Sequence, residues 1–135
     1  MAQWQFNPFT ERLDLVNRDL DLTFTAGATL GGQRVVTLNG QGELIHADHA
    51  NASHSGRICG LTLTSALSGS LVTVRSFGLL ADPSWHWDTS RPRLFLSSNG
   101  TITQSVPASG FLCVVGFCLS ETQLFIDIQP AIQLI

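Results

Sequence analysis

Apolar and polar residues alternate with a period of two along most of this chain, from Leu13 to the C-terminus. Such alternation is typical of β-strands that bury one face. The alternating runs are short, recur at regular intervals, and are separated by turns rich in glycine, serine, asparagine and proline. The pattern predicts an all-β fold of about nine or ten short antiparallel strands and no helix, arranged as a small sandwich, jelly roll or barrel.

Two Asn-Gly dipeptides mark predicted hairpins. Asn39-Gly40 separates the strands expected over Arg34–Leu38 and Glu43–Ala47, and Asn99-Gly100 separates "RLFLSS" from "TITQS". Both residues of Asn-Gly tolerate the positive φ of a type I′ turn, the tightest common connection between antiparallel strands. We therefore expect two tight hairpins, and we expect "GFLCVVGFCLS" and "TQLFIDIQ" to form a third strand pair.

The first residues differ from the rest of the chain. Residues 1–12 hold the aromatic-rich stretch "QWQFNPF", which has no period and is interrupted by Pro8. We expect these residues to form an extended attachment arm, and residues 13–135 to form a single all-β domain. Trp4, Phe6 and Phe9 would anchor the arm in a neighbouring subunit or a larger assembly. Alternatively, the arm folds back over its own core.

The stretch "DPSWHWDTSRP" places two tryptophans in a loop bounded by Pro83 and Pro92. Trp85 and Trp87 share strand parity, so in an extended segment they face one way and His86 the other. One interpretation is a ligand platform that stacks on a sugar ring of a host surface glycan. The alternative, which we favour, is a structural loop that closes one end of the domain close to a subunit interface, each indole N–H bonded to a carbonyl. Arg91 and Arg93 would then pair with Asp82 and Asp88 and hold the loop shut.

Composition narrows the choice of function. The 135 residues suit one domain, and charged residues make up only 13% of them, with a net charge of −3 and no lysine. Without a basic stripe the chain is not expected to bind nucleic acid. No run approaches the ~20 apolar residues of a membrane span, and the N-terminus lacks the apolar core of a secretory leader. Surfaces poor in charge are typical of β-proteins that assemble with copies of themselves.

The three cysteines suit folding in a reducing cytoplasm. Cys113 and Cys118 lie five residues apart, which in one extended strand is roughly 16 Å and places the side chains on opposite faces. That separation is too long for a disulfide. We expect both to be small buried apolar residues.

Catalytic and metal motifs are weak. The stretch "HADHANASH" supplies His46, Asp48, His49 and His54, with Cys59 further along, but this spacing matches no closed zinc motif. A solvated loop is the competing interpretation, and we expect no metal and no cofactor. The sequence also lacks a Gly-x-Ser-x-Gly elbow and a glycine-rich phosphate loop before a helix. We expect no enzymatic activity.

Several stretches resemble a β-rich module of tailed bacteriophages and prophages. They are "VRSFGLL", "PSWHW", "FLSSNGTITQ" and the ending "VVGFCLSETQLFIDI", while "QFNPFTERLDL" is similar to the arm that precedes such modules. The likeness covers roughly residues 25–135 for the module and 4–15 for the arm. Members of this group are small virion proteins or the heads of collagen-like fibres. The chain is also loosely similar to small capsid decoration proteins.

The resemblance implies a structural protein that carries out no chemistry. Its members assemble, usually as homotrimers, after synthesis in the bacterial host cytoplasm. It implies a virion protein attached to the tail or baseplate as a short fibre or tip, because the chain has no collagen-like repeat. A capsid decoration (cement) protein is the alternative, and a carbohydrate-binding module a further one. The expected partners are copies of the chain and other phage structural proteins.

Overall fold

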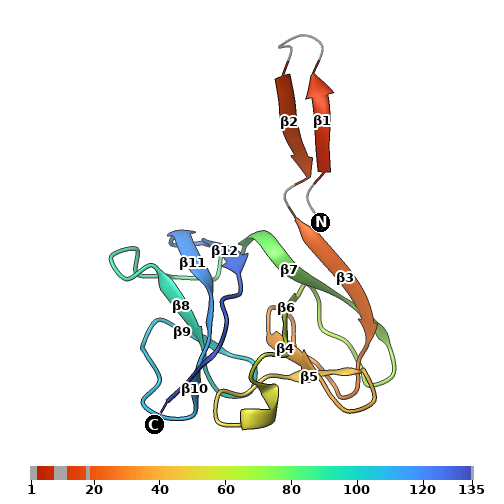
Figure 1. Cartoon of the computed structure of the whole chain (residues 1–135), viewed down its shortest axis with the longest axis vertical. Coiled ribbons are helices and arrows are strands. Elements are labelled where there is room, and N and C mark those ends of the chain that lie inside the picture. The colour runs from red at the N-terminus through yellow and green to blue at the C-terminus, as the bar shows by residue number, and fades with distance from the viewer. Residues whose placement is uncertain (1–2, 8–11, 18, 135) are drawn as a thin grey trace.

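The computed structural model describes residues 3–7, 12–17 and 19–134, and within them the regular structure is β-strand apart from one 3₁₀ turn at Ala52–His54. The all-β expectation is confirmed. Most strands join one antiparallel sheet that curls into a half-barrel, which places the fold nearest to the barrel among the three expected architectures (Figure 1).

Nine strands form the main sheet, in the order β5-β4-β6-β7-β12-β11-β8-β9, with β3 also pairing β7. Two further strand pairs stand apart from it, β1 with β2 and β10 with β13. The strands are β1 (Gln3–Asn7), β2 (Arg12–Asn17), β3 (Leu20–Thr25), β4 (Val35–Leu38), β5 (Leu44–His46), β6 (Ile58–Thr62), β7 (Leu71–Ala81), β8 (Arg93–Leu96), β9 (Ile102–Thr103), β10 (Phe111–Leu112), β11 (Val114–Ser120), β12 (Gln123–Asp127) and β13 (Ile132–Gln133).

Strand β7 connects the two parts of the sheet. Its residues Leu71–Phe77 pair with β3, Val74 and Arg75 pair with β6, and Phe77–Ala81 pair with β12. Its 11 residues thus serve three neighbours, because a long strand can exchange partners along its length. The β7–β12–β11–β8 part of the sheet carries the surface described below.

The curl is held where the β8–β9 hairpin reaches the far end of the sheet. Val35 N donates to Gly100 O at 2.8 Å, Gly100 N donates to Ala47 O at 2.6 Å, and Ala47 N donates to Val35 O at 2.9 Å. These three bonds satisfy backbone groups that would otherwise lie unpaired at the ends of the sheet. The tip of one predicted hairpin therefore fixes the position of the other.

Two hydrophobic clusters form the core, on opposite faces of β4. Val35 belongs to the larger cluster with Leu61, Leu94, Phe111, Leu124 and others, whereas Val36 belongs to the smaller one with Leu30, Leu44 and Val74. Successive residues of a strand point to opposite faces, so the Val-Val pair reaches both clusters. Complete burial of both valines makes β4 a central layer rather than a half-buried strand.

The two Asn-Gly dipeptides adopt different turns. Asn99 and Gly100 have φ of 53° and 73°, and Thr101 N donates to Ser98 O at 3.1 Å, as the type I′ prediction requires. At the other dipeptide neither Asn39 nor Gly40 has a positive φ. The type I′ expectation for Asn39-Gly40 is wrong, although the β4–β5 hairpin itself is confirmed.

The predicted boundary between arm and domain falls inside an element. Among the described strands, β2, which was expected to begin the domain, pairs with β1, and the predicted boundary between residues 12 and 13 lies inside it. The register places Trp4 opposite Leu15 and Phe6 opposite Leu13. Phe9 lies outside the described residues. The role of the arm in attachment stays a prediction.

The two late cysteines lie in one core rather than on opposite faces. Cys113 and Cys118 are both free and buried in the larger cluster. The expectation that their side chains lie on opposite faces is wrong, because the register of β11 shifts between Val114 and Gly116. One extra residue in a strand returns the later side chains to the inner face. The expectation that both are buried is confirmed.

Candidate interaction surface

The Trp85–Trp87 loop packs against the half-barrel. Both tryptophans are half-buried against the larger core cluster while His86 is exposed. Their ring centroids lie 5.5 Å apart with the planes tilted by 46°, so they form a packed pair and share no common plane. The backbone rests on the β11–β12 turn, where Trp87 N donates to Glu121 O at 2.9 Å and Asp82 N donates to Thr122 O at 2.9 Å.

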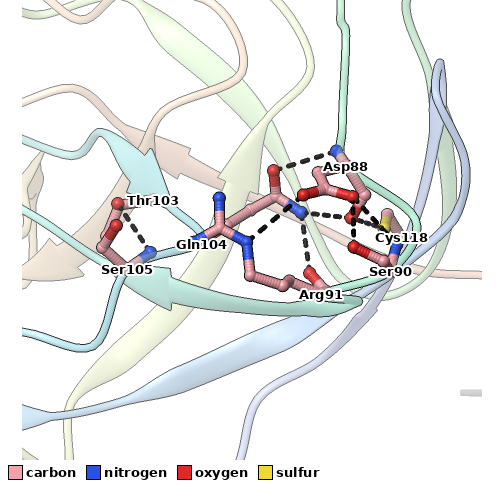
Figure 2. A network of polar contacts seen from close by, with 7 residues as sticks. All are labelled: Asp88, Ser90, Arg91, Thr103, Gln104, Ser105 and Cys118. Atoms are coloured by element: carbon pink, nitrogen blue, oxygen red, sulfur yellow. Dashed lines mark hydrogen bonds and ion pairs between the residues drawn. The ribbon is translucent and has the colours of Figure 1, made fainter.

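A side chain outside the loop fastens its C-terminal end. The amide of Gln104 accepts from Asp88 N at 3.0 Å and donates to Asp88 O at 2.8 Å and Arg91 O at 2.7 Å (Figure 2). Ser90 donates to the Asp88 carboxylate through both its N–H and its hydroxyl, and these bonds lower the pKa of Asp88. Gln104 follows β9 directly, so its place beside the loop depends on the fold.

Only part of the expected ion pairing around the loop is present. Arg91 Nε lies 3.3 Å from Asp88 Oδ2, in an exposed pair of small energetic weight. Asp82 instead accepts from the N–H and hydroxyl of Ser84, which lowers its pKa. Arg93 makes no ion pair with the described part of the chain. The pairing expected for Asp82 and Arg93 is therefore wrong.

The indole of Trp87 also departs from expectation. Its Nε1 is buried, and no described residue offers it a hydrogen-bond acceptor. Leaving a buried donor without a partner costs about 1–3 kcal/mol. The packing of the two rings offsets part of that cost, and the loop's place at a subunit interface stays a prediction.

The residues considered as metal ligands serve instead as connectors between loops. His46 Nε2 accepts from Gly31 N at 3.1 Å, Asp48 accepts from Ala50 N at 2.9 Å, and His54 Nδ1 accepts from Asp48 N at 3.0 Å. His49 Nδ1 lies 3.0 Å from Ser109 O. Across residues 3–7, 12–17 and 19–134, no three His, Cys, Asp or Glu side chains converge as a metal site would require.

The thiols are shielded rather than activated. Burial raises the pKa of Cys113 to about 11 and also raises that of Cys59. A raised pKa disfavours the thiolate, which is the reactive form.

In the described part of the chain we also find no helix long and apolar enough to span a membrane.

The outer face of the β7–β12–β11 wall is apolar. Leu79, Phe125 and Phe117 lie side by side in register on β7, β12 and β11. Phe125 stacks on Phe117 at 5.5 Å and meets Phe77 edge to face at 5.0 Å. The exposed fractions of Phe77, Leu79, Phe117 and Leu119 lie between 37% and 52%. These five residues are called the aromatic wall below.

One sequence signal could have located the aromatic wall. Strands β7, β11 and β12 are apolar at both parities, as in "FGLL", "GFCLS" and "LFI". Alternation accounts for a single buried face, so an apolar second face indicates a surface that another layer covers.

A groove lies beside the aromatic wall, between β8, β11 and β12. It measures about 420 Å³ and is lined by Phe117 and Gly116, with Arg93 and Asp127 also on its lining. A Cβ at Gly116 would collide with the carbonyl oxygen of Phe125, so only glycine fits this floor. Neither Arg93 nor Asp127 makes an ion pair with any described residue. The groove thus offers an apolar floor and one charge of each sign.

At the opposite end, the aromatic wall is bounded by a closed ionic cluster. Arg75 lies 2.9 Å from Asp21 Oδ1 and 3.5 Å from Asp19 Oδ2, and it donates to Leu79 O at 2.7 Å. The hydrogen bonds that Arg75 donates to the Asp21 carboxylate raise the pKa of Arg75 above its ordinary value. Because its charges are already paired within the chain, this end offers little to a partner.

No protein-family model matches this chain, and no curated protein matches its sequence.

Proposed function

We propose that this chain is a non-enzymatic structural protein of a tailed bacteriophage virion, a homo-oligomeric β-module attached to the tail or baseplate as a short fibre or tip protein. The observation that carries the proposal is the aromatic wall, with three phenylalanines and two leucines over three adjacent strands. Small soluble monomers rarely expose a contiguous apolar patch of this kind, and such patches mark assembly surfaces.

Other features agree with an assembling protein. Several polar side chains of the 46–54 loop and of the Trp85–Trp87 loop are used in hydrogen bonds within the chain, among them His46, His54 and Asp88. The phage assignment itself rests on the resemblance of the quoted motifs, such as "PSWHW" and "FLSSNGTITQ". The β1–β2 hairpin, whose strands pair with each other alone, supplies a separate segment for attachment.

The proposal is tested by locating and counting the chain in purified particles of the phage that encodes it. Quantitative gel analysis against the major capsid protein should find a handful of copies per particle, as a tail or tip position requires. Hundreds of copies would overturn the tail assignment in favour of a capsid decoration protein. Complete absence from the particles would overturn the virion assignment.

The attachment role of the arm has its own test. A chain lacking residues 1–17 should keep its β circular-dichroism spectrum, because β1 and β2 pair with no strand of the main sheet. It should no longer enter particles when it replaces the full chain. Normal incorporation of the folded, truncated chain would show that attachment uses another surface.

A further inference from the structure

We propose that the groove beside the aromatic wall is a two-fold contact between two copies of this chain, in which Arg93 of each copy pairs with Asp127 of the other. The inference deepens the proposed function, because it names the contact by which the module assembles with itself.

The charges of the groove favour a second copy over a different partner. Arg93 and Asp127 line the same groove, and neither has an ion-pair partner in the described part of the chain. A partner that presents only one sign of charge would satisfy one of them and repel the other. A two-fold rotation places the arginine of each copy against the aspartate of the other, so the groove is complementary to itself.

The apolar residues make the same contact favourable. Phe117 belongs to the aromatic wall and also lines the groove, in register with Arg93 on one side and Phe125 on the other. Its ring is 38% exposed although it stacks on Phe125, and Leu119 beyond it is 52% exposed. Facing a second copy would remove the apolar area of these side chains from water, which favours association. Flanking ion pairs would then set the orientation.

The geometry also explains why the charged residues are free to act. Arg93 begins β8 and is exposed, and the groove next to it lies where the register of β11 shifts between Val114 and Gly116. Gly116 has no side chain to fill the groove, and its position admits no Cβ. Arg91, one residue before Pro92, is by contrast paired with Asp88 and belongs to the Trp loop.

The proposal predicts the mass of the full chain in solution. Sedimentation velocity at tens of micromolar should give a species of twice the 14.6 kDa chain mass, or an even multiple of it. If the species is a dimer, the two-fold contact takes the place of the trimer that the resemblance implies. If it is a hexamer, the two-fold contact joins two such trimers. A monomer, or a trimer alone, would overturn the proposal.

Charge reversal provides the sharper experiment. Arg93→Asp and Asp127→Arg should each weaken self-association roughly 100-fold, because each creates two like-charge contacts across the interface. When the two variants are mixed in equal amounts, every contact again joins opposite charges, so the mixture should associate as the unaltered chain does. If both variants are folded by circular dichroism and the mixture stays monomeric, the proposal is overturned.

Arg57→Asp is the matched control. It makes the same change in net charge as Arg93→Asp, at an exposed arginine that follows the Ala52–His54 turn and is not among the residues that line the groove. It should leave self-association unchanged, and an equal loss in this variant would assign the effect to net charge. Because the experiment uses the purified chain, self-association can succeed where virion incorporation fails, and the two proposals are judged separately.

Discussion

The two Asn-Gly turns carry the same dipeptide and end in different structures. Asn99-Gly100 adopts left-handed backbone at both residues and docks against Val35 and Ala47, far away in the sequence. Asn39-Gly40 lies in a wider loop, where Asn39 Oδ1 accepts from Gln41 N at 2.9 Å and from Glu43 N at 3.0 Å. There Gly42, with φ of 76°, takes the left-handed position instead.

The difference shows that Asn-Gly allows left-handed backbone, and that the contacts around the turn determine whether this conformation is adopted. In the first turn the side chain of Asn99 reaches another hairpin, with Oδ1 3.0 Å from His46 Nδ1. In the second turn the side chain of Asn39 bonds within its own loop, which competes with the tighter turn.

Gly100→Ala should have the largest effect, a loss of about 2–4 kcal/mol in the free energy of unfolding. A Cβ at this position would lie 2.8 Å from Val35 O, and the φ of 73° adds left-handed strain. Urea denaturation measures the loss. Gly42→Ala is the control, since its φ is also positive but nothing lies within 4 Å. If the two variants lose the same amount, the docking of the first turn contributes nothing.

Asn99→Ala should cost about 1–2 kcal/mol. The substitution places alanine in left-handed backbone and removes the contact with His46 Nδ1. Asn99→Gly separates the two causes, because it relieves the backbone and still removes the side chain. Denaturant midpoints of the two variants give the share of each, and a glycine variant as stable as the original chain would show that the contact with His46 carries no weight.

Asn39→Ala should cost about 1 kcal/mol, as the loss of a side chain that accepts two backbone N–H groups does. These donors lie in an exposed loop, so water replaces part of the lost bonding. Thermal melts should show a small fall in Tm, and Asn39→Asp should retain most of the stability because its carboxylate accepts the same bonds. A fall as large as that of Asn99→Ala would remove the distinction between a local and a docked turn.

Gly40→Ala should have the smallest effect, between no change and a gain of about 0.5 kcal/mol. No atom lies within 4 Å of the added Cβ, and the φ of Gly40 is not positive. Alanine there reduces the freedom of the unfolded chain without strain in the folded one. A loss of more than about 1 kcal/mol in the free energy of unfolding, measured by urea denaturation, would mean that position 40 requires glycine, as a type I′ turn predicts.

The candidate surface could be predicted from the sequence only in part. The Trp85–Trp87 loop was visible because two large rings between prolines are conspicuous in a small domain. The hydrogen bonds by which Gln104 holds this loop could not be predicted, because nothing in the spacing of "TITQS" connects the Gln104 amide to Asp88. Apolar residues at both parities mark the aromatic wall, but only the order β7-β12-β11 places them on adjacent strands. The groove lies at a register shift of β11 that no pattern of residue types encodes.

Local periodicity was enough to predict the all-β class, Asn-Gly was enough to predict a hairpin at each site, and the apolar character of the thiols was enough to predict that Cys113 and Cys118 are buried. Tertiary structure alone decided the curl of the sheet, the parity of Cys118 after the shift in β11, and which Asn-Gly became a type I′ turn. Each of these depends on backbone contacts between residues distant in the chain, such as Val35 with Gly100. Period-2 patterning fixes which face of a strand is buried, whereas pairing order and register are set by the contacts that bury it.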